Sequence, residues 1–395
     1  MSETVMPAAD WAERDDLPAL VAALGADDCR YVGGCVRDAL LGVPASDVDI
    51  ATRHRPETTQ NLLKQAGIRS VPTGIDHGTI TAILPRGPVE ITTLRKDVDT
   101  DGRHAIVAFA NEWFDDAARR DFTINALYAH PETLRISDYF GGLDDLEARV
   151  VRFIGDAETR IREDHLRILR YFRFQARFGS KVDDKAETAC RDLASTLKGL
   201  SRERVAGELL AILALPDPAA SFERMAQLGV LPVILPEVDD EGIATLAALQ
   251  QAESREHLPP DPIRRLAALL PPDAEQARQV ASRLRLSNAQ KKRIGLAADR
   301  QTHDGDDPRS LAYRLGIETA RDRLLLLGEG IGPITGWTVP RLPVSGGDIM
   351  RAGIGQGPLI ARTLHAIEGR WIAEGFPDAE RTRAILVEEV GKARM

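Results

Sequence analysis

The sequence predicts an α+β protein: a head built from a mixed sheet with helices, followed by a long all-α remainder. Up to about residue 150, short runs rich in β-branched residues alternate with helical stretches. From Ala157 onward, apolar residues such as Leu166, Leu169 and Phe172 recur at the three- and four-residue spacing of helices. A chain of 395 residues is also too long for one ordinary core, which indicates about two to four domains.

The expected elements can be placed in order along the chain. The predicted strands include residues 48–51, 78–84, 89–93 and 106–109. Breaks between the later helices are predicted at 215–218, 257–260, 270–272, 303–308 and 331–343, where prolines and glycines gather. These changes of texture divide the chain into the predicted parts 1–148, 149–215, 216–310 and 311–395.

Composition excludes several classes of protein. The content of 43% hydrophobic and 28% charged residues is typical of a soluble globular protein, and the net charge of −9 argues against a nonspecific nucleic-acid binder. No apolar run reaches the ~18 residues of a membrane span, and the start of the chain lacks a signal peptide, so we expect a cytoplasmic protein. Cys29, Cys35 and Cys190 fit neither a disulfide framework nor a zinc motif, which predicts small buried thiols.

The most informative motif joins a glycine turn to two aspartates. Gly33 and Gly34 let the backbone approach a ligand, and the following helix, which carries Arg37, offers N–H groups to an anion such as a triphosphate. Asp47 and Asp49 stand two apart in an extended run, so both carboxylates can share a divalent cation. Each half alone is common in turns and solvated loops. Their order and spacing together predict metal-assisted phosphoryl chemistry.

Two further segments carry polar groups that suit a nucleotide. Glu90 interrupts a β-branched run and is either a third carboxylate near the metals or a solvent-facing strand position. In the run from 119 to 127, Arg120 matches phosphate oxygens, while Asp121 and Asn125 can bond ribose hydroxyls. Taken alone, this run could equally be a helix start with a salt bridge.

The segment 163–167 is expected to open a helix rich in arginine. Asp164 and Arg167 are three apart and would neighbour each other on one helical face, either as an ion pair or as readers of a base. An Asp acceptor beside an Arg donor complements cytosine and adenine and repels uracil and guanine. The arginines from 160 to 177, which include Arg170, and the basic run from 283 to 293 are either solvated faces or phosphate contacts.

Five motifs follow one another along the chain, at residues 33–50, 119–127, 138–146, 163–167 and 201–209. Two further segments, 283–288 and 343–358, continue the same pattern. This order resembles that of the class II CCA-adding tRNA nucleotidyltransferases and the related bacterial poly(A) polymerases. The resemblance covers nearly the whole chain. It implies a polymerase-β-like head (1–148), a neck with the nucleotide-base template (149–215), and a body (216–310) and a tail (311–395) that bind tRNA.

The resemblance also implies an activity and a set of residue roles. The enzyme would add CCA to tRNA 3′ ends from CTP and ATP and release pyrophosphate, with two Mg²⁺ ions and no obligate protein partner. The implied roles are metal binding by Asp47 and Asp49; a triphosphate cradle from Gly33, Gly34 and Arg37; ribose and phosphate contacts from Arg120, Asp121 and Asn125; and a template of Glu163, Asp164 and Arg167. The residues themselves add Glu90 as a third acid near the metals and Arg170, from the arginine cluster, as a further nucleotide contact. Arg204 and Glu208 match the motif that supports the template, and 96–104 resembles the loop that helps the site switch from C to A.

Other functions remain open at this point. A poly(A) polymerase shares the head and neck motifs, and an enzyme that adds only CC or only A would share most of them. A noncatalytic RNA-binding protein is disfavoured because Asp47, Asp49, Asp164 and Arg167 are all present. The pair His303-Asp304 is expected to lie in a solvated loop rather than in a phosphohydrolase metal site.

Overall fold

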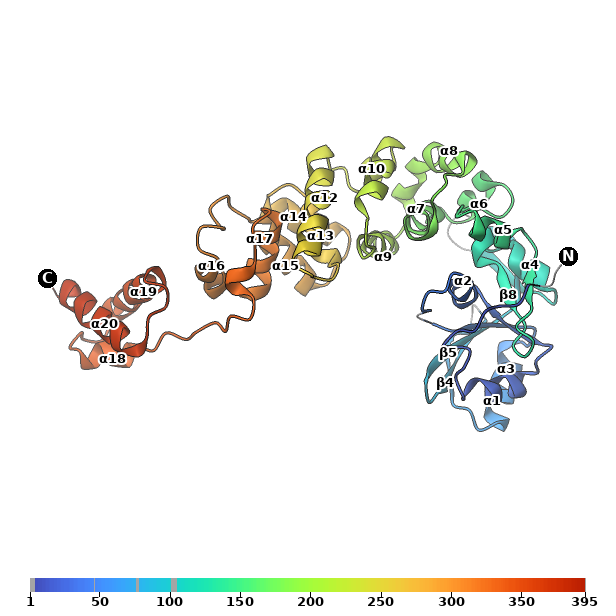
Figure 1. Ribbon diagram of the computed structural model, residues 1–395, viewed down its shortest axis with the longest axis horizontal. Helices are drawn as coiled ribbons and strands as arrows, with labels where there is room; N and C mark the ends of the chain where they lie inside the picture. The colour runs from blue at the N-terminus through green and yellow to red at the C-terminus, as the bar shows by residue number, and fades with distance from the viewer. Residues whose placement is uncertain (1–3, 46, 76–77, 101–104, 395) are drawn as a thin grey trace. The chain divides into compact units, whose positions relative to one another are not determined.

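The computed structural model describes residues 4–45, 47–75, 78–100 and 105–394, and it divides into two compact units, Met1–Pro236 and Glu237–Met395 (Figure 1). The first unit contains the sheets and the helices around them, and the second is helical in its described part. The predicted α+β class is confirmed. The division at residue 236 falls inside the predicted part 216–310. The boundaries at 148, 215 and 310 therefore stay predictions.

A seven-stranded mixed sheet forms the centre of the first unit. Its strands are β1 (Cys29–Val32), β2 (Asp49–Thr52), β3 (Ser70–Gly74), β4 (Thr79–Leu84), β5 (Gly87–Thr93), β8 (Leu127–Ala129) and β9 (Ile136–Asp138). They lie in the order β3-β4-β5-β2-β1-β8-β9, in which only β2 and β5 pair in parallel. A separate ribbon pairs β6 (Arg95–Thr100) with β7 (Ala105–Phe109). The four predicted strands are all present, with ends shifted by one or two residues.

Helices cover the sheet and continue the first unit. They are α1 (Leu17–Leu24), α2 (Gly34–Leu40), α3 (Pro56–Gln65), α4 (Trp113–Ala118), α5 (Gly142–Glu147), α6 (Ala157–Glu163), α7 (Arg167–Phe178), α8 (Asp184–Asp192), α9 (Arg202–Leu213), α10 (Ala219–Gln227) and α11 (Leu231–Ile234), with 3-10 turns η2 (Thr123–Asn125) and η3 (Ala194–Gly199). Strand alternation explains the two faces of the sheet: Ile80 and Leu84 of β4 are buried, while Ile83 between them is exposed. On the face that bears Val32, the core contains Trp113 and Tyr128.

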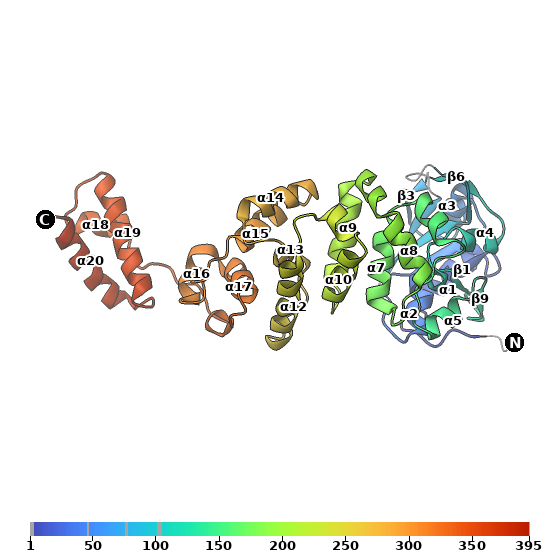
Figure 2. The same ribbon diagram turned by 90° about the horizontal axis from the view of Figure 1, so that it is seen from above.

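The amphipathic helix α7 joins the helical part to the head. Its buried side chains include Leu169 and Phe172, as the helical periodicity predicts. Phe174 and Phe178 of the same helix stack on the guanidinium of Arg37 in α2, at 5.3 and 4.3 Å from the ring centroids. Accordingly, α7 lies beside α2 in both views (Figures 1 and 2).

The second unit is built from nine helices in its described residues. They are α12 (Asp240–Arg255), α13 (Pro262–Leu269), α14 (Ala274–Arg283), α15 (Asn288–Ala298), α16 (Pro308–Leu315), α17 (Ile317–Leu326), α18 (Gly346–Arg351), α19 (Pro358–Ala373) and α20 (Ala379–Ala393), with the turn η4 (Gly332–Ile334). The predicted breaks between helices are all present. The prediction that His303-Asp304 lies in a solvated loop is wrong for the Asp304 side chain. This carboxylate is buried and forms an ion pair with Arg323 at 3.3 Å.

Two further findings bear on the sequence analysis. The three cysteines are free and buried, as predicted. Within the described ranges, no helix combines the length and apolar character that crossing a membrane requires.

Candidate active site

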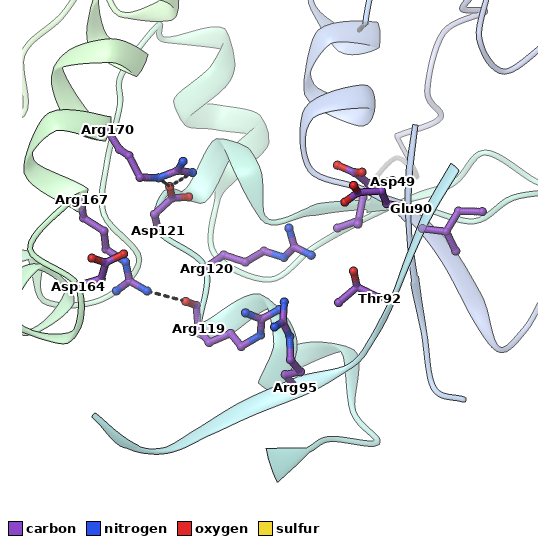
Figure 3. Close-up of a pocket in the computed structure, with 12 residues that line it drawn as sticks. Asp49, Glu90, Thr92, Arg95, Arg119, Arg120, Asp121, Asp164, Arg167 and Arg170 are labelled. Carbon is purple, nitrogen blue, oxygen red and sulfur yellow. Dashed lines mark hydrogen bonds and ion pairs between the residues drawn. The ribbon is translucent and has the colours of Figure 1, made fainter. Parts of the chain in front are cut away.

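A cleft of about 330 Å³ opens between the head sheet and helix α7 (Figure 3). Its lining residues are Val32, Asp49, Ile50, Glu90, Thr92, Arg95, Arg119, Arg120, Asp121, Asp164, Arg167 and Arg170. Carboxylates of the sheet stand on one side, and arginines from the α4–η2 segment and from α7 stand on the other. Figure 3 shows the guanidinium of Arg120 extending toward Asp49 and Glu90. Such a distribution suits a ligand that carries both negative phosphates and a cation.

The acidic side of the cleft is set by the pairing of two strands. Asp49 of β2 is aligned with Glu90 of β5 in the parallel register, so both side chains leave the same face of the sheet. Asp47 precedes β2 and is exposed. Burial, together with the negative charges of Glu90 and Asp47, raises the pKa of Asp49 to about 6, although the charge of Arg120 opposes this increase. The site therefore carries an excess of negative charge, which a bound cation would neutralise.

The donor chemistry fits Mg²⁺ when a substrate supplies the other ligands. Carboxylate oxygens are the ligands that this hard cation prefers, and it is usually held by one or two carboxylates together with substrate phosphates. Among the residues that the structure describes, no three or more acidic, histidine or cysteine side chains form a group able to hold a metal by themselves. Metal binding by Asp47 and Asp49 stays a prediction.

The glycine turn has the backbone conformation that only glycine adopts easily. Gly33 precedes α2 with φ 72° and ψ −123°, and a Cβ at this position would lie 3.4 Å from Nη1 of Arg120. Gly34 begins the helix. The turn thus brings bare backbone close to one of the cleft arginines, an arrangement compatible with the predicted triphosphate cradle.

Arg37 has an environment different from the predicted one. Its side chain is buried, donates to Asp38 and donates to Oδ1 of Asn125 at 2.5 Å, and stacks on Phe174 and Phe178 of α7. It is not among the residues that line the cleft. A guanidinium that meets phosphate oxygens has to face the ligand, whereas this one joins α2 to η2 and α7. Its contact with a nucleotide stays a prediction.

Asp121 lines the cleft, and Asn125 supports it from behind. Asp121 accepts hydrogen bonds from Arg170 Nε at 2.7 Å and from Asn125 Nδ2 at 3.0 Å. Desolvation alone would raise the pKa of Asp121, but the charge of Arg170 and these hydrogen bonds lower it to about 2. Arg170 also lies 3.7 Å from Glu208, which accepts from Arg173 at 2.7 Å. Both predicted ribose ligands thus belong to one bonded network, although only Asp121 faces the cleft.

The prediction that Asp164 and Arg167 lie on one helical face is wrong. Helix α6 ends at Glu163, α7 begins at Arg167, and Asp164 between them is extended, with φ −150° and ψ 104°. Asp164 accepts from Arg204 of α9 at 2.7 Å. Arg167 donates to Glu163 at 2.5 Å and to the backbone oxygen of Arg119 at 3.0 Å. Both still line the cleft, because separate partners hold them there.

The arginine-rich stretch is mostly paired inside the protein. Arg160 and Arg167 pair with Glu163, Arg170 and Arg173 with Glu208, and Arg177 with Asp38. Neither a purely solvated face nor a row of phosphate contacts describes it. In the second basic group, Arg283 pairs with Glu237 and Arg293 with Asp322.

Three polar residues near the cleft have no role in the sequence analysis. Thr92 and Arg95 line the cleft beside Arg119 of the predicted 119–127 run, and the buried carboxylate of Asp116 lies behind two of the cleft arginines. The spacing of Asp116 to Arg119 and Arg120, three and four residues, could have revealed the last of these.

Comparison with known proteins agrees with this arrangement. The family "Poly A polymerase head domain" matches residues 29–152, and "Probable RNA and SrmB- binding site of polymerase A" matches residues 179–241. The CCA tRNA nucleotidyltransferase 1, mitochondrial, of Mus musculus is 36% identical over 373 residues, which cover 88% of this chain and 84% of the mouse protein. The chain belongs to the CCA tRNA nucleotidyltransferase family. The resemblance found in the motifs is confirmed.

Solved structures of CCA-adding enzymes share the fold. The enzyme of Bacillus stearothermophilus, solved in complex with CTP, has a TM-score of 0.73 and 25% identity, covering 96% of this chain and 98% of that one. The Thermotoga maritima enzyme, complexed with tRNA, has a TM-score of 0.73 and 22% identity over 99% and 100% of the two chains. In the predicted switching loop at 96–104, residues 96–100 belong to strand β6, and residues 101–104 lie outside the described residues.

Proposed function

We propose that this protein adds cytidine and adenosine nucleotides from CTP and ATP to the 3′ end of tRNA and so builds CCA without a nucleic-acid template. One observation carries the proposal. A single cleft brings the aligned acids Asp49 and Glu90 opposite several arginines, with Asp164 and Arg167 on its other wall. The name of the mouse relative and the CTP complex of the Bacillus stearothermophilus enzyme support this choice of substrates.

The proposed chemistry needs no nucleophilic side chain. The tRNA 3′-hydroxyl would attack the α-phosphorus of the nucleotide in line, and pyrophosphate would leave. Asp47 and Asp49 would hold two Mg²⁺ ions. When bound, these ions would lower the pKa of the attacking hydroxyl and neutralise the charge of the leaving pyrophosphate. Arg119 and Arg120 would bind phosphate oxygens from the opposite wall. Glu90 would either join the metal ligands or shape the acidic side of the cleft.

Base choice would depend on Asp164 and Arg167. An Asp acceptor and an Arg donor match the edges of cytosine and adenine and oppose those of uracil and guanine. Glu163 would hold Arg167 and Arg204 would hold Asp164, since these ion pairs fix both groups at the cleft. Asp121 would bind the ribose, while Asn125 would support Asp121 from behind and Arg170 would orient it.

The helical parts would hold the tRNA. Under this proposal residues 1–148 form the head, 149–215 the neck, 216–310 the body and 311–395 the tail, and the last two bind the acceptor arm by shape and backbone charge. The match of residues 179–241 to an RNA-binding family supports RNA contact beyond the head. A cytoplasmic location without obligate protein partner stays a prediction, and the mouse relative's name places that protein in mitochondria.

A poly(A) polymerase is the second candidate, because the head matches a family of that name. The deciding experiment offers Mg²⁺, each NTP separately and in combination, and tRNA that ends at the discriminator base, at its first added C or at CC. Addition of C, C and A followed by arrest supports CCA synthesis. Long A tails on unrelated RNA would support the second candidate, and addition confined to CC or to A would reveal a partial enzyme.

A further inference from the structure

Asp116 of α4 is a buried carboxylate at the centre of a hydrogen-bond cluster behind the cleft wall. Its exposed fraction is 1%. Oδ1 accepts from Arg119 Nε at 2.9 Å and from the backbone N–H of Arg95 at 3.1 Å. Oδ2 accepts from the Tyr128 hydroxyl at 2.7 Å and from Arg120 Nη2 at 3.1 Å. Arg95, Arg119 and Arg120 all line the cleft, whereas Asp116 does not.

The charge of this carboxylate determines the direction of the hydrogen bonds. Desolvation favours the neutral acid, but the charges of Arg120 and Arg119 and the Tyr128 hydroxyl hold the pKa of Asp116 far below its usual range. An ionised carboxylate only accepts, so the Tyr128 hydroxyl donates to it and accepts from Arg120 Nε at 3.0 Å. Asp116, Tyr128 and Arg120 therefore form a closed ring of hydrogen bonds.

We propose that Asp116 is a positioning residue that holds Arg119 and Arg120 at the cleft wall for nucleotide binding. Two adjacent guanidinium groups repel each other, and one carboxylate between them allows both to face the same cleft. The effect extends further, because the backbone oxygen of Arg119 accepts from Arg167 Nη2 at 3.0 Å. One buried charge thus orders the phosphate-facing arginines and the turn that anchors a base-reading arginine. The activity measurements below rest on the proposed function.

A second buried carboxylate in the head supplies a matched control. Asp145 is 8% exposed, and it accepts from Thr123 Oγ1 at 2.7 Å and from Arg152 Nε at 3.1 Å. None of these three residues lines the cleft. Loss of the Asp145 charge should therefore destabilise the head without displacing the arginines that face the nucleotide.

The test compares Asp116→Asn with Asp145→Asn in the full chain. The amide presents a donor where Asp116 accepts, so one of its N–H groups would oppose a guanidinium or hydroxyl donor. We expect Asp116→Asn, assayed below its melting temperature, to lower kcat/KM for CTP by about tenfold to a hundredfold. Misplaced binding groups reduce the rate by that much. Asp145→Asn should keep wild-type kinetic constants despite a similar fall in Tm. Equal kinetic constants in the two variants would overturn the proposal.

Tyr128→Phe gives a milder variant that keeps the buried charge. Loss of the bridging hydroxyl should reduce kcat/KM by about threefold, in keeping with one hydrogen bond. Because the hydroxyl acts through Asp116, the double variant should be no worse than Asp116→Asn alone, and fully additive losses would contradict the ring. Should Asp116→Asn fail to fold, Tyr128→Phe decides the proposal, since unchanged kinetics in that variant would overturn it.

Binding of CTP, measured by calorimetry without tRNA, separates this inference from the proposed function. Weaker CTP binding by Asp116→Asn than by Asp145→Asn supports the positioning role even if the wild-type protein adds no nucleotide to tRNA. A wild-type protein that adds no nucleotide to tRNA would overturn the proposed function alone. Equal CTP affinity in the two variants, with active wild-type enzyme, would overturn the positioning role alone.

Discussion

Arg170 of α7 donates its Nε–H to Oδ2 of Asp121 at 2.7 Å, so helix α7 and the segment that follows α4 meet in one ion pair. Asp121 also accepts from Asn125, whose side-chain oxygen accepts from Arg37. On its other side, Arg170 lies 3.7 Å from Glu208 of α9. A continuous polar chain therefore runs from α2 to α9, and it links α7 to the segment that carries Asp121.

Asp121→Asn tests the strength of this chain. The pKa of Asp121 is about 2, below its usual 3.8, because Arg170 and Asn125 outweigh its desolvation. Since the folded pKa is the lower one, the ionised form stabilises the fold fully above about pH 4, and this contribution is lost as the pH falls toward 2. We expect the variant to lose about 1–2 kcal/mol of unfolding free energy at pH 7 in urea, and less at pH 3. A loss that does not change with pH would show that the ion pair is not its source.

Asp47→Ala tests the metal site. The carboxylate is exposed, so its removal should leave the fold intact. If it holds a catalytic cation, loss of several kcal/mol of transition-state stabilisation lowers the rate of nucleotide addition about a thousandfold. Filter binding should show unchanged affinity for tRNA. Full activity at saturating Mg²⁺ would remove Asp47 from the metal ligands.

Elements with strong local signals could be predicted from the sequence. Runs of β-branched residues predict the strands that hold Asp49 and Glu90, and apolar spacing with proline breaks predicts the later helices. Both signals arise from the chain's own periodicity, so they survive without knowledge of tertiary contacts. The ordered motifs likewise indicate which polar residues belong to one site.

Contacts between distant segments could not be predicted in this way. The spacing of Asp164 and Arg167 suits a continuous helix, but Asp164 pairs with Arg204, forty residues later, and its backbone is extended. Arg37 follows a glycine turn that suits an anion, yet the rings of Phe174 and Phe178, far along the chain, cover its guanidinium. In each case a side chain's partner, rather than its own neighbours in sequence, determines where it points.

The buried thiols predict slow reaction with thiol reagents. Burial raises the pKa of Cys29 to about 12 and that of Cys35 to about 12, and it also raises the pKa of Cys190. The thiolate, which is the reactive form, is therefore scarce at pH 8. We expect a chromogenic disulfide reagent to modify almost no thiol in the native protein and all three cysteines in guanidinium chloride. Rapid native reaction would contradict their burial.

Glu253→Gln should destabilise the second unit strongly. Glu253 is 1% exposed and accepts from Arg264 Nε at 2.9 Å and from Arg265 Nε at 2.8 Å. Removal of one charge from a buried ion-pair group leaves the others uncompensated, which costs about 3–5 kcal/mol. Urea unfolding followed by circular dichroism measures the loss. Glu275→Gln removes an exposed partner of Arg278 and should cost less than about 1 kcal/mol, so equal effects would argue against the buried network.

Arg204→Ala should loosen base choice although Arg204 does not line the cleft. Its guanidinium donates to Asp164 at 2.7 Å and holds that carboxylate at the cleft, where a cytosine or adenine amino group would meet it. With Asp164 released, discrimination worth about 1–3 kcal/mol is lost, so UTP incorporation relative to CTP should rise about tenfold. Arg167→Ala should loosen base choice similarly, because it removes the other half of the edge. Arg191→Ala is the control, because it removes an exposed arginine that forms an ion pair with the neighbouring Asp192 at 3.0 Å. If both cleft variants keep wild-type selectivity in single-nucleotide assays on tRNA lacking its terminal CCA, Asp164 and Arg167 do not read the base, and shape alone must select it.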